Sequence, residues 1–193
     1  MITREQFSFV RDKYGQHASW AAWAEEGDTP KSNMGDTSIF EDDQILLCLN
    51  PNMVLVGLNF SIPIIFQSPF ENFHGKGGGA YKIRYALKGT SLWGAYMTDI
   101  VKDYPEKESG KVGLYLRKNR KFREENVQRF RQELIDIGAD KPTLIAFGNE
   151  THKILEQYFG NEFSVLKVTH YSHYMSKEAY REEILDFLAN CQR

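Results

Sequence analysis

The sequence predicts an α/β fold in which helices cover a parallel sheet on both faces. Short apolar segments typical of buried strands alternate with amphipathic segments of helical period, and this alternation indicates βαβ units. The chain has 193 residues, of which 41% are hydrophobic and 13% are aromatic, so one domain can form a core without disulfides or metal. We expect a single domain over residues 1–193, with residues 1–50 as an N-terminal extension packed on it.

Four segments are expected to be strands because they are apolar at consecutive positions and are flanked by turn residues. They are residues 53–59, 93–98, 143–147 and 163–168. Three segments with several Gly, Pro or other turn residues are expected to be irregular, namely residues 27–38, 60–79 and 102–116.

Five segments are expected to be helices because their apolar residues recur at helical spacing. Thr3 and Gln6 form a capping box at the start of the first helix, and Ser176 caps the last. Gly138 ends the third helix. The expected helices cover residues 3–14, 81–87, 124–137, 149–158 and 176–191.

The charge and hydropathy of the chain exclude several classes of protein. The 24 Lys and Arg residues nearly balance the 26 Asp and Glu residues, which excludes a basic nucleic-acid tail and an acidic disordered chain. No apolar run approaches a membrane span, and residues 1–6 hold no signal-peptide core, so we expect a cytoplasmic protein with no membrane partner. The one dense basic run, residues 117–123, either contacts a DNA backbone or forms a solvated face.

The candidate ligand site lies at the strand ends, because parallel sheets bind ligands beyond the carboxyl ends of their strands. The residues expected there are Asn59, Asp99, Gly148 and His170. No group of His, Cys, Asp or Glu has the spacing of metal ligands, so no metal and no other cofactor is expected.

Short motifs stand at these four strand ends in a fixed order. They are Gly57-Leu58-Asn59-Phe60-Ser61, the segment YMTDIVK at residues 96–102, Gly148-Asn149-Glu150, and His170-Tyr171-Ser172. This ordered set resembles the uracil-DNA glycosylase superfamily, which has a Gly-x-Asn-Pro-Gly/Ser or Gly-Gln-Asp-Pro motif, a strand ending in a base-reading Asn, a Leu-Leu-Gly-x-x-Ala strand and a His-Pro-Ser motif. The second motif looks most like Tyr-Ile-Thr-Asn-Val-Val-Lys of the iron–sulfur branch. The resemblance covers roughly residues 53–174.

The resemblance implies a three-layer α/β/α sandwich with a central four-stranded parallel sheet. The chain departs from the family at Phe60 and Tyr171, where the family has Pro, and at Asp99, where it has Asn. The iron–sulfur branch needs four cysteine ligands, whereas this chain has only Cys48 and Cys191. An iron–sulfur cluster is therefore excluded.

The resemblance also implies roles for the matched residues. Asn59 would orient the attacking water, and His170 would donate a hydrogen bond to the base as negative charge accumulates on it. Gly57 and Ser172 are taken as substrate-binding residues of the same motifs, and His173 is a rival of His170. The alternatives are an Asn that satisfies backbone groups in a turn and a His bonded within its own loop.

Asp99 stands where the resemblance implies a residue that reads the base. An Asn presents a donor and an acceptor, which match uracil, whereas an ionised Asp presents acceptors only. Acceptors suit an edge with two donors, such as that of guanine, and a protonated Asp would read cytosine. Plain uracil is therefore expected to be a poor substrate. The alternative is an Asp that caps the following turn or pairs with Lys102.

A base turned out of the nucleic-acid stack also needs an aromatic ring beside it. Phe60, Phe66 and Phe70 are candidates in the segment after the first strand, with Phe73 nearby. The alternative is that these rings pack the segment onto the core.

The resemblance implies hydrolysis of an N-glycosidic bond, in DNA or in a nucleobase-containing small molecule, by a monomer that needs no cofactor. The alternative is a protein of the same fold that binds a nucleotide or nucleic acid without cutting it, since a fold does not by itself define a function.

Overall fold

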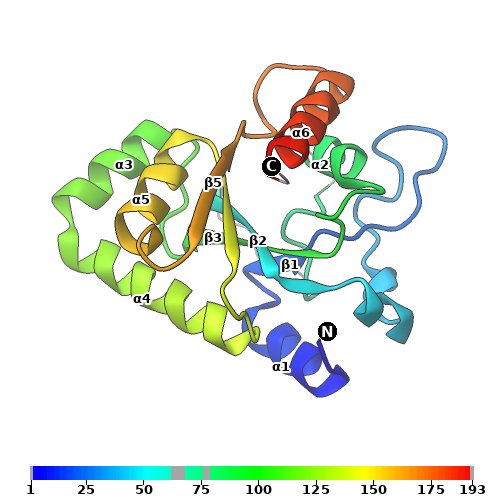
Figure 1. Ribbon diagram of the computed structural model, residues 1–193, viewed down its shortest axis with the longest axis horizontal. Helices are drawn as coiled ribbons and strands as arrows, with labels where there is room; N and C mark the ends of the chain where they lie inside the picture. Colours follow the sequence, from blue (N-terminus) through cyan, green and yellow to red (C-terminus); the bar gives the residue numbers. More distant parts are fainter. Residues whose placement is uncertain (1, 62–67, 76–78, 192–193) are drawn as a thin grey trace.

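Five strands form one mixed sheet at the centre of the protein. The computed structural model describes residues 2–61, 68–75 and 79–191. The sheet has the order β1-β3-β2-β4-β5 (Figure 1). β2, β3, β4 and β5 pair in parallel, and β1 pairs antiparallel with β3. The strands are β1 (Ala18–Trp20), β2 (Asn50–Asn59), β3 (Ala95–Val101), β4 (Thr143–Phe147) and β5 (Ser164–Val168).

The α/β class is confirmed, but the expected four-stranded parallel sheet is wrong, because β1 adds a fifth, antiparallel strand at one edge. β1 is only three residues long and all three are buried, so it shows no alternation that would reveal a strand. Pairing with β3 and a hydrogen bond from the Ser19 hydroxyl to the Phe70 carbonyl (3.0 Å) hold it in place. The N-terminal fifty residues therefore contribute a strand to the sheet as well as packing on it.

Helices cover both faces of the sheet. Figure 1 shows α3, α4 and α5 on one side and α2 and α6 on the other. Each face of the sheet has its own hydrophobic core, and successive strand residues point into opposite cores because side chains alternate along a strand. Val54 and Val56 belong to one core and Leu55 belongs to the other. The helices are α1 (Arg4–Tyr14), α2 (Ala80–Leu87), α3 (Ser109–Lys118), α4 (Arg120–Asp136), α5 (Asn149–Phe159) and α6 (Lys177–Cys191), with short 3-10 helices η1 (Ser38–Phe40) and η2 (Asp43–Leu47).

Two expected helix caps are confirmed. The Thr3 hydroxyl accepts a hydrogen bond from the Gln6 amide (3.1 Å), and the Ser176 hydroxyl accepts one from the Ala179 amide (3.0 Å). Each bond satisfies a backbone donor that the first turn of a helix leaves unpaired. None of the described helices is long and apolar enough to cross a membrane.

The expected loop over residues 102–116 is partly wrong, because α3 begins at Ser109 and runs to Lys118. Gly110 and Gly113 suggest a loop, but Gly113 serves close packing instead. A Cβ atom there would lie 2.6 Å from Oε2 of Glu150 at the start of α5. Gly113 therefore indicates close contact between α3 and α5 rather than a loop.

The strand expected at residues 93–98 is shifted, since β3 extends to Val101. Asp99 therefore lies inside the strand, in register with Gly57 of β2. Because successive strand residues point to opposite faces, Thr98 and Asp99 serve different sides of the sheet. Thr98 faces α4, where its hydroxyl donates to Glu133 (2.8 Å).

A buried ion pair joins β3 to α4. The Nζ of Lys102 lies 2.9 Å from Oε2 of Glu133, and the two side chains are 7% and 0% exposed. The Tyr96 hydroxyl donates to the other carboxylate oxygen (2.7 Å), which Thr98 also contacts. Since the charges are paired and hydrogen-bonded, the cost of burying them is largely offset.

Replacing Lys102 by Met is expected to lower the free energy of unfolding by about 3 kcal/mol or more, because Glu133 would keep a buried charge without a partner. Arg129→Met is the matched control, since the Arg129–Asp103 pair is more than half exposed and should contribute less than about 1 kcal/mol. Urea unfolding near pH 7 measures both variants. Equal losses in the two would contradict the importance of the buried pair.

Candidate functional site

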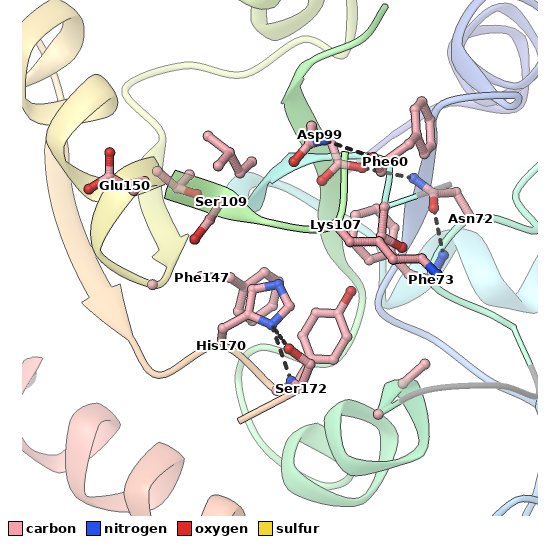
Figure 2. A pocket seen from close by; sticks show the side chains of 18 of the residues that line it. Phe60, Asn72, Phe73, Asp99, Lys107, Ser109, Phe147, Glu150, His170 and Ser172 are labelled. Atoms are coloured by element: carbon pink, nitrogen blue, oxygen red, sulfur yellow. Dashed lines mark hydrogen bonds between the residues drawn. The ribbon is translucent and has the colours of Figure 1, made fainter. Parts of the chain in front are cut away.

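A cavity of about 700 Å³ opens at the carboxyl end of the parallel strands (Figure 2). Its size is that of a small-molecule pocket. Its walls come from the ends of β2 and β4, from Asp99 of β3, from the loop after β5 and from the first residues of α2 and α5. The structure thus brings all four residues expected at the strand ends, Asn59, Asp99, Gly148 and His170, to one cavity.

Asn59 is the last residue of β2, and its side-chain nitrogen is fully engaged. This nitrogen donates to the carbonyls of Phe60 (2.7 Å), Tyr104 (2.8 Å) and Glu106 (2.9 Å). These bonds tie the segment after β3 to the end of β2. The nitrogen therefore has a structural role, and the side-chain oxygen is the atom of Asn59 that can orient a water molecule in the cavity.

His170 follows β5 and is held in one tautomer. Its Nδ1 accepts a hydrogen bond from the backbone N–H of Ser172 (3.1 Å), and the Ser172 hydroxyl lies 2.8 Å from the same nitrogen (Figure 2). Since a backbone N–H can only donate, the proton of the neutral ring is on Nε2. Burial lowers the pKa of His170 to about 4, so near pH 7 the ring is an uncharged donor.

Asp99 carries a buried carboxyl group that is only weakly hydrogen-bonded. The residue is 5% exposed, and the Nδ2 of Asn72 lies 3.4 Å from its Oδ2. Burial raises the pKa of Asp99 to about 6, although the charge of Lys102 and the bond from Asn72 oppose the shift. Lys102 pairs with Glu133, and no ion pair joins it to Asp99 among the described residues.

Gly57 does not line the cavity, but it makes room for Asp99. A Cβ atom on Gly57 would lie 2.1 Å from Oδ1 of Asp99, closer than any non-bonded contact allows. The carboxyl group therefore lies over the backbone of the neighbouring strand. The role of Gly57 is therefore to leave room for the Asp99 carboxyl group, not to contact a ligand.

The aromatic candidates differ in position. Phe60 lines the cavity, with its ring packed against His17 at a centroid distance of 5.7 Å. Phe70 is 1% exposed and packs against Phe7 and Phe40 in the core, outside the cavity lining. Phe66 lies outside the described residues. Phe73, not Phe70, brings a ring to the cavity.

The two remaining candidates lie on the loop after β5. Ser172 lines the cavity and holds His170. His173 is exposed and does not line the cavity; its carbonyl accepts a hydrogen bond from Lys82 of α2 (2.9 Å). His170, not His173, therefore belongs to the cavity wall.

Sequence reasoning gave no binding role to Asn72, Phe147 or Tyr171, which also line the cavity. Phe147 ends β4, so its position at the carboxyl edge was available from the strand pattern. Asn72 sits in an irregular segment where no local pattern indicates its direction. Across the described part of the chain, no three His, Cys, Asp or Glu side chains are grouped as metal ligands.

No protein-family model, curated protein or solved structure matches this chain.

Asp99→Asn is expected to stabilise the protein at neutral pH. Because the pKa rises from 3.8 to about 6 on folding, the folded state binds more protons between those values. The free energy of unfolding therefore falls as the pH rises from about 4 to about 6, because ionising Asp99 costs more in the folded state than in the unfolded state. The variant should gain up to about 3 kcal/mol near pH 7 and little near pH 4.

Urea unfolding over this pH range measures the effect, with Asp28→Asn as the control at an exposed aspartate. A gain from Asp99→Asn that does not change with pH would contradict the assigned pKa shift.

Proposed function

We propose that this chain hydrolyses the N-glycosidic bond of a nucleobase, as a divergent enzyme of the uracil-DNA glycosylase type that acts on DNA. The observation that carries the proposal is the presence of a neutral His170 in the same cavity as Asn59 and Asp99, at the carboxyl end of the sheet. Helices on both faces of the sheet agree with the three-layer α/β/α sandwich of that superfamily, to which β1 is an addition.

The chemistry begins with a base turned out of the stack into the cavity. The glycosidic bond breaks through an oxocarbenium-like state, and the bonding electrons leave with the base. The Nε2–H of His170 donates to a base oxygen that gains negative charge, which lowers the barrier as an oxyanion hole does. A water oriented by the Asn59 oxygen then adds to the sugar carbon, and its proton passes to the departed base anion, so that the products are the neutral base and an abasic sugar.

The base is read by Asp99 and stacked by Phe73. The Cε1 of Phe73 lies 3.8 Å from where a Cβ of Gly57 would be, so this ring adjoins the Asp99 carboxyl group. With a pKa of about 6, Asp99 is mostly ionised near pH 7 and offers acceptors only. A carbonyl facing it would be repelled, so plain uracil is proposed to be a poor substrate.

Contact with the DNA backbone is assigned to the basic run at the junction of α3 and α4. Arg117, Lys118, Arg120 and Lys121 are exposed there. Arg120 and Lys121 also pair with Glu124 and Glu125 of α4, but exposed pairs of this kind are weak and exchange readily for phosphate.

A second candidate function is binding of a nucleotide or nucleic acid without hydrolysis. The three carbonyls that engage the Asn59 nitrogen favour it, because they give this residue a structural reason to be present. Salt dependence separates DNA from a small ligand, since affinity for DNA falls steeply with salt.

The test of the enzymatic proposal is a glycosylase screen. Labelled single- and double-stranded oligonucleotides would carry uracil, hypoxanthine, xanthine or a normal base, with alkaline cleavage of any abasic site formed. Cleavage at one base supports the proposal. Absence of cleavage at every base, by folded protein in excess over DNA, would overturn it.

His170→Ala is expected to reduce the single-turnover cleavage rate by about 100-fold or more, because it removes the donor to the leaving base. His152→Ala is the control, since His152 is on α5 but does not line the cavity. Circular dichroism would verify that both variants are folded. An unchanged rate in His170→Ala would remove His170 from the mechanism.

Asp99→Asn is expected to shift preference toward uracil, because an amide supplies the donor that faces O4. The rate of the parent protein should also change near pH 6, the pKa of Asp99, and this transition should be absent from the variant. Rates for each base from about pH 5 to 8 measure both effects. An unchanged preference would mean that Asp99 does not face the base.

A further inference from the structure

Tyr171 is fixed in the cavity wall by three contacts. Its ring stacks on His170 with a centroid distance of 4.4 Å and an angle of 25°, and it meets the ring of Phe147 edge-on at 5.2 Å and 86°. Its carbonyl lies so close to Gly79 that a Cβ there would be 2.6 Å away. The phenol ring is therefore positioned before any ligand binds, which favours specific recognition.

The hydroxyl group of Tyr171 is a donor with no hydrogen-bond partner among the residues that the structure describes. The residue lines the cavity, and within the described residues its hydroxyl makes no hydrogen bond. Burial raises its pKa, and the negative charge of Asp99 raises it further. The group therefore stays protonated near neutral pH and can donate to a ligand acceptor.

Asp99 and Tyr171 line the same cavity, and both lie near the carboxyl ends of β2 and β4. Asp99 leans over Gly57 of β2. Val56 pairs with Ala146 of β4, so the next position along each strand brings Gly57 beside Phe147. Tyr171 packs on Phe147. Asp99 and Tyr171 both line the cavity, and the Tyr171 hydroxyl group is near enough to Asp99 for the carboxylate charge to raise its pKa.

We propose that Asp99 and Tyr171 together recognise the lactam edge of a purine, with Asp99 accepting from N1–H and Tyr171 donating to O6. This inference rests on the proposed function, because it takes the occupant of the cavity to be a nucleobase. In this arrangement Asp99 supplies the acceptor and Tyr171 supplies the donor, whereas a single asparagine amide can supply both. It also gives a binding role to the tyrosine that replaces the family's proline.

The second carboxylate oxygen of Asp99 selects among lactams. In guanine the group next to N1–H is the amino group on C2, which can donate to this oxygen. In hypoxanthine C2 carries only a hydrogen, which does not repel the carboxylate. In xanthine and uracil the neighbour is a second carbonyl, which the carboxylate repels. Adenine has no ring N–H at this edge. The preferred occupants are therefore guanine and hypoxanthine, and the cavity of about 700 Å³ has room for a purine.

The test is calorimetric binding of free bases near pH 8, where Asp99 is ionised. Hypoxanthine and guanine are compared with adenine, xanthine and uracil. The variants are Tyr171→Phe, which removes only the hydroxyl group, and Tyr174→Phe as the control at a fully exposed tyrosine of the same loop. The parent protein should bind hypoxanthine about 10-fold or more tightly than adenine and xanthine.

Tyr171→Phe should bind hypoxanthine more weakly and should lose part of the preference over adenine, because Asp99 still disfavours the unprotonated N1 of adenine. It should keep the preference over xanthine, which Asp99 provides. Tyr174→Phe should behave as the parent. Failure to bind any free base, or an equal preference in Tyr171→Phe and the parent, would overturn the inference. Selective base binding in a protein that cleaves no oligonucleotide would support it while rejecting the proposed hydrolysis, so the two failures are distinguishable.

Discussion

The Asp99 carboxyl group occupies space that exists only because residue 57 is a glycine. The in-register pairing of β2 and β3 sets these two residues side by side, and the missing side chain lets the carboxylate lie over the neighbouring backbone. Asn72, Phe73 and Tyr171 are then arranged around it from segments outside the sheet. The position of the Asp99 carboxyl group in the cavity depends on this single close approach.

Two acidic groups on opposite faces of β3 illustrate how burial can serve stability or function. Glu133, at the α4 face, has Lys102, Tyr96 and Thr98 as partners, so its charge is compensated. Asp99, at the other face, has among the described residues only a long hydrogen bond from Asn72, and burial therefore dominates its pKa. An incompletely satisfied carboxyl group in a cavity is typical of a binding or catalytic site.

In both His170 and Asn59, one polar side-chain atom is hydrogen-bonded within the protein and the other can contact a ligand. One nitrogen of the His170 ring is held by the backbone of Ser172, which leaves the protonated nitrogen for a ligand. The nitrogen of Asn59 secures the segment after β3, which leaves its oxygen. In each residue one polar atom positions the side chain and the other can act on a substrate, a general arrangement in preorganised sites.

The sequence by itself determined the four parallel strands and, of the six α-helices in the described residues, all except α3. It also determined the edge of the sheet at which Asn59, Asp99 and His170 meet, because the carboxyl ends of parallel strands share one edge. Only the tertiary structure decided that residues 18–20 form a strand and that Gly113 belongs to a helix, since each depends on a partner distant in the chain. It also decided that Phe73 rather than Phe70 reaches the cavity and that Tyr171 lines the same cavity as Asp99. These side chains come from loops, where no repeating backbone geometry fixes direction and packing alone does so.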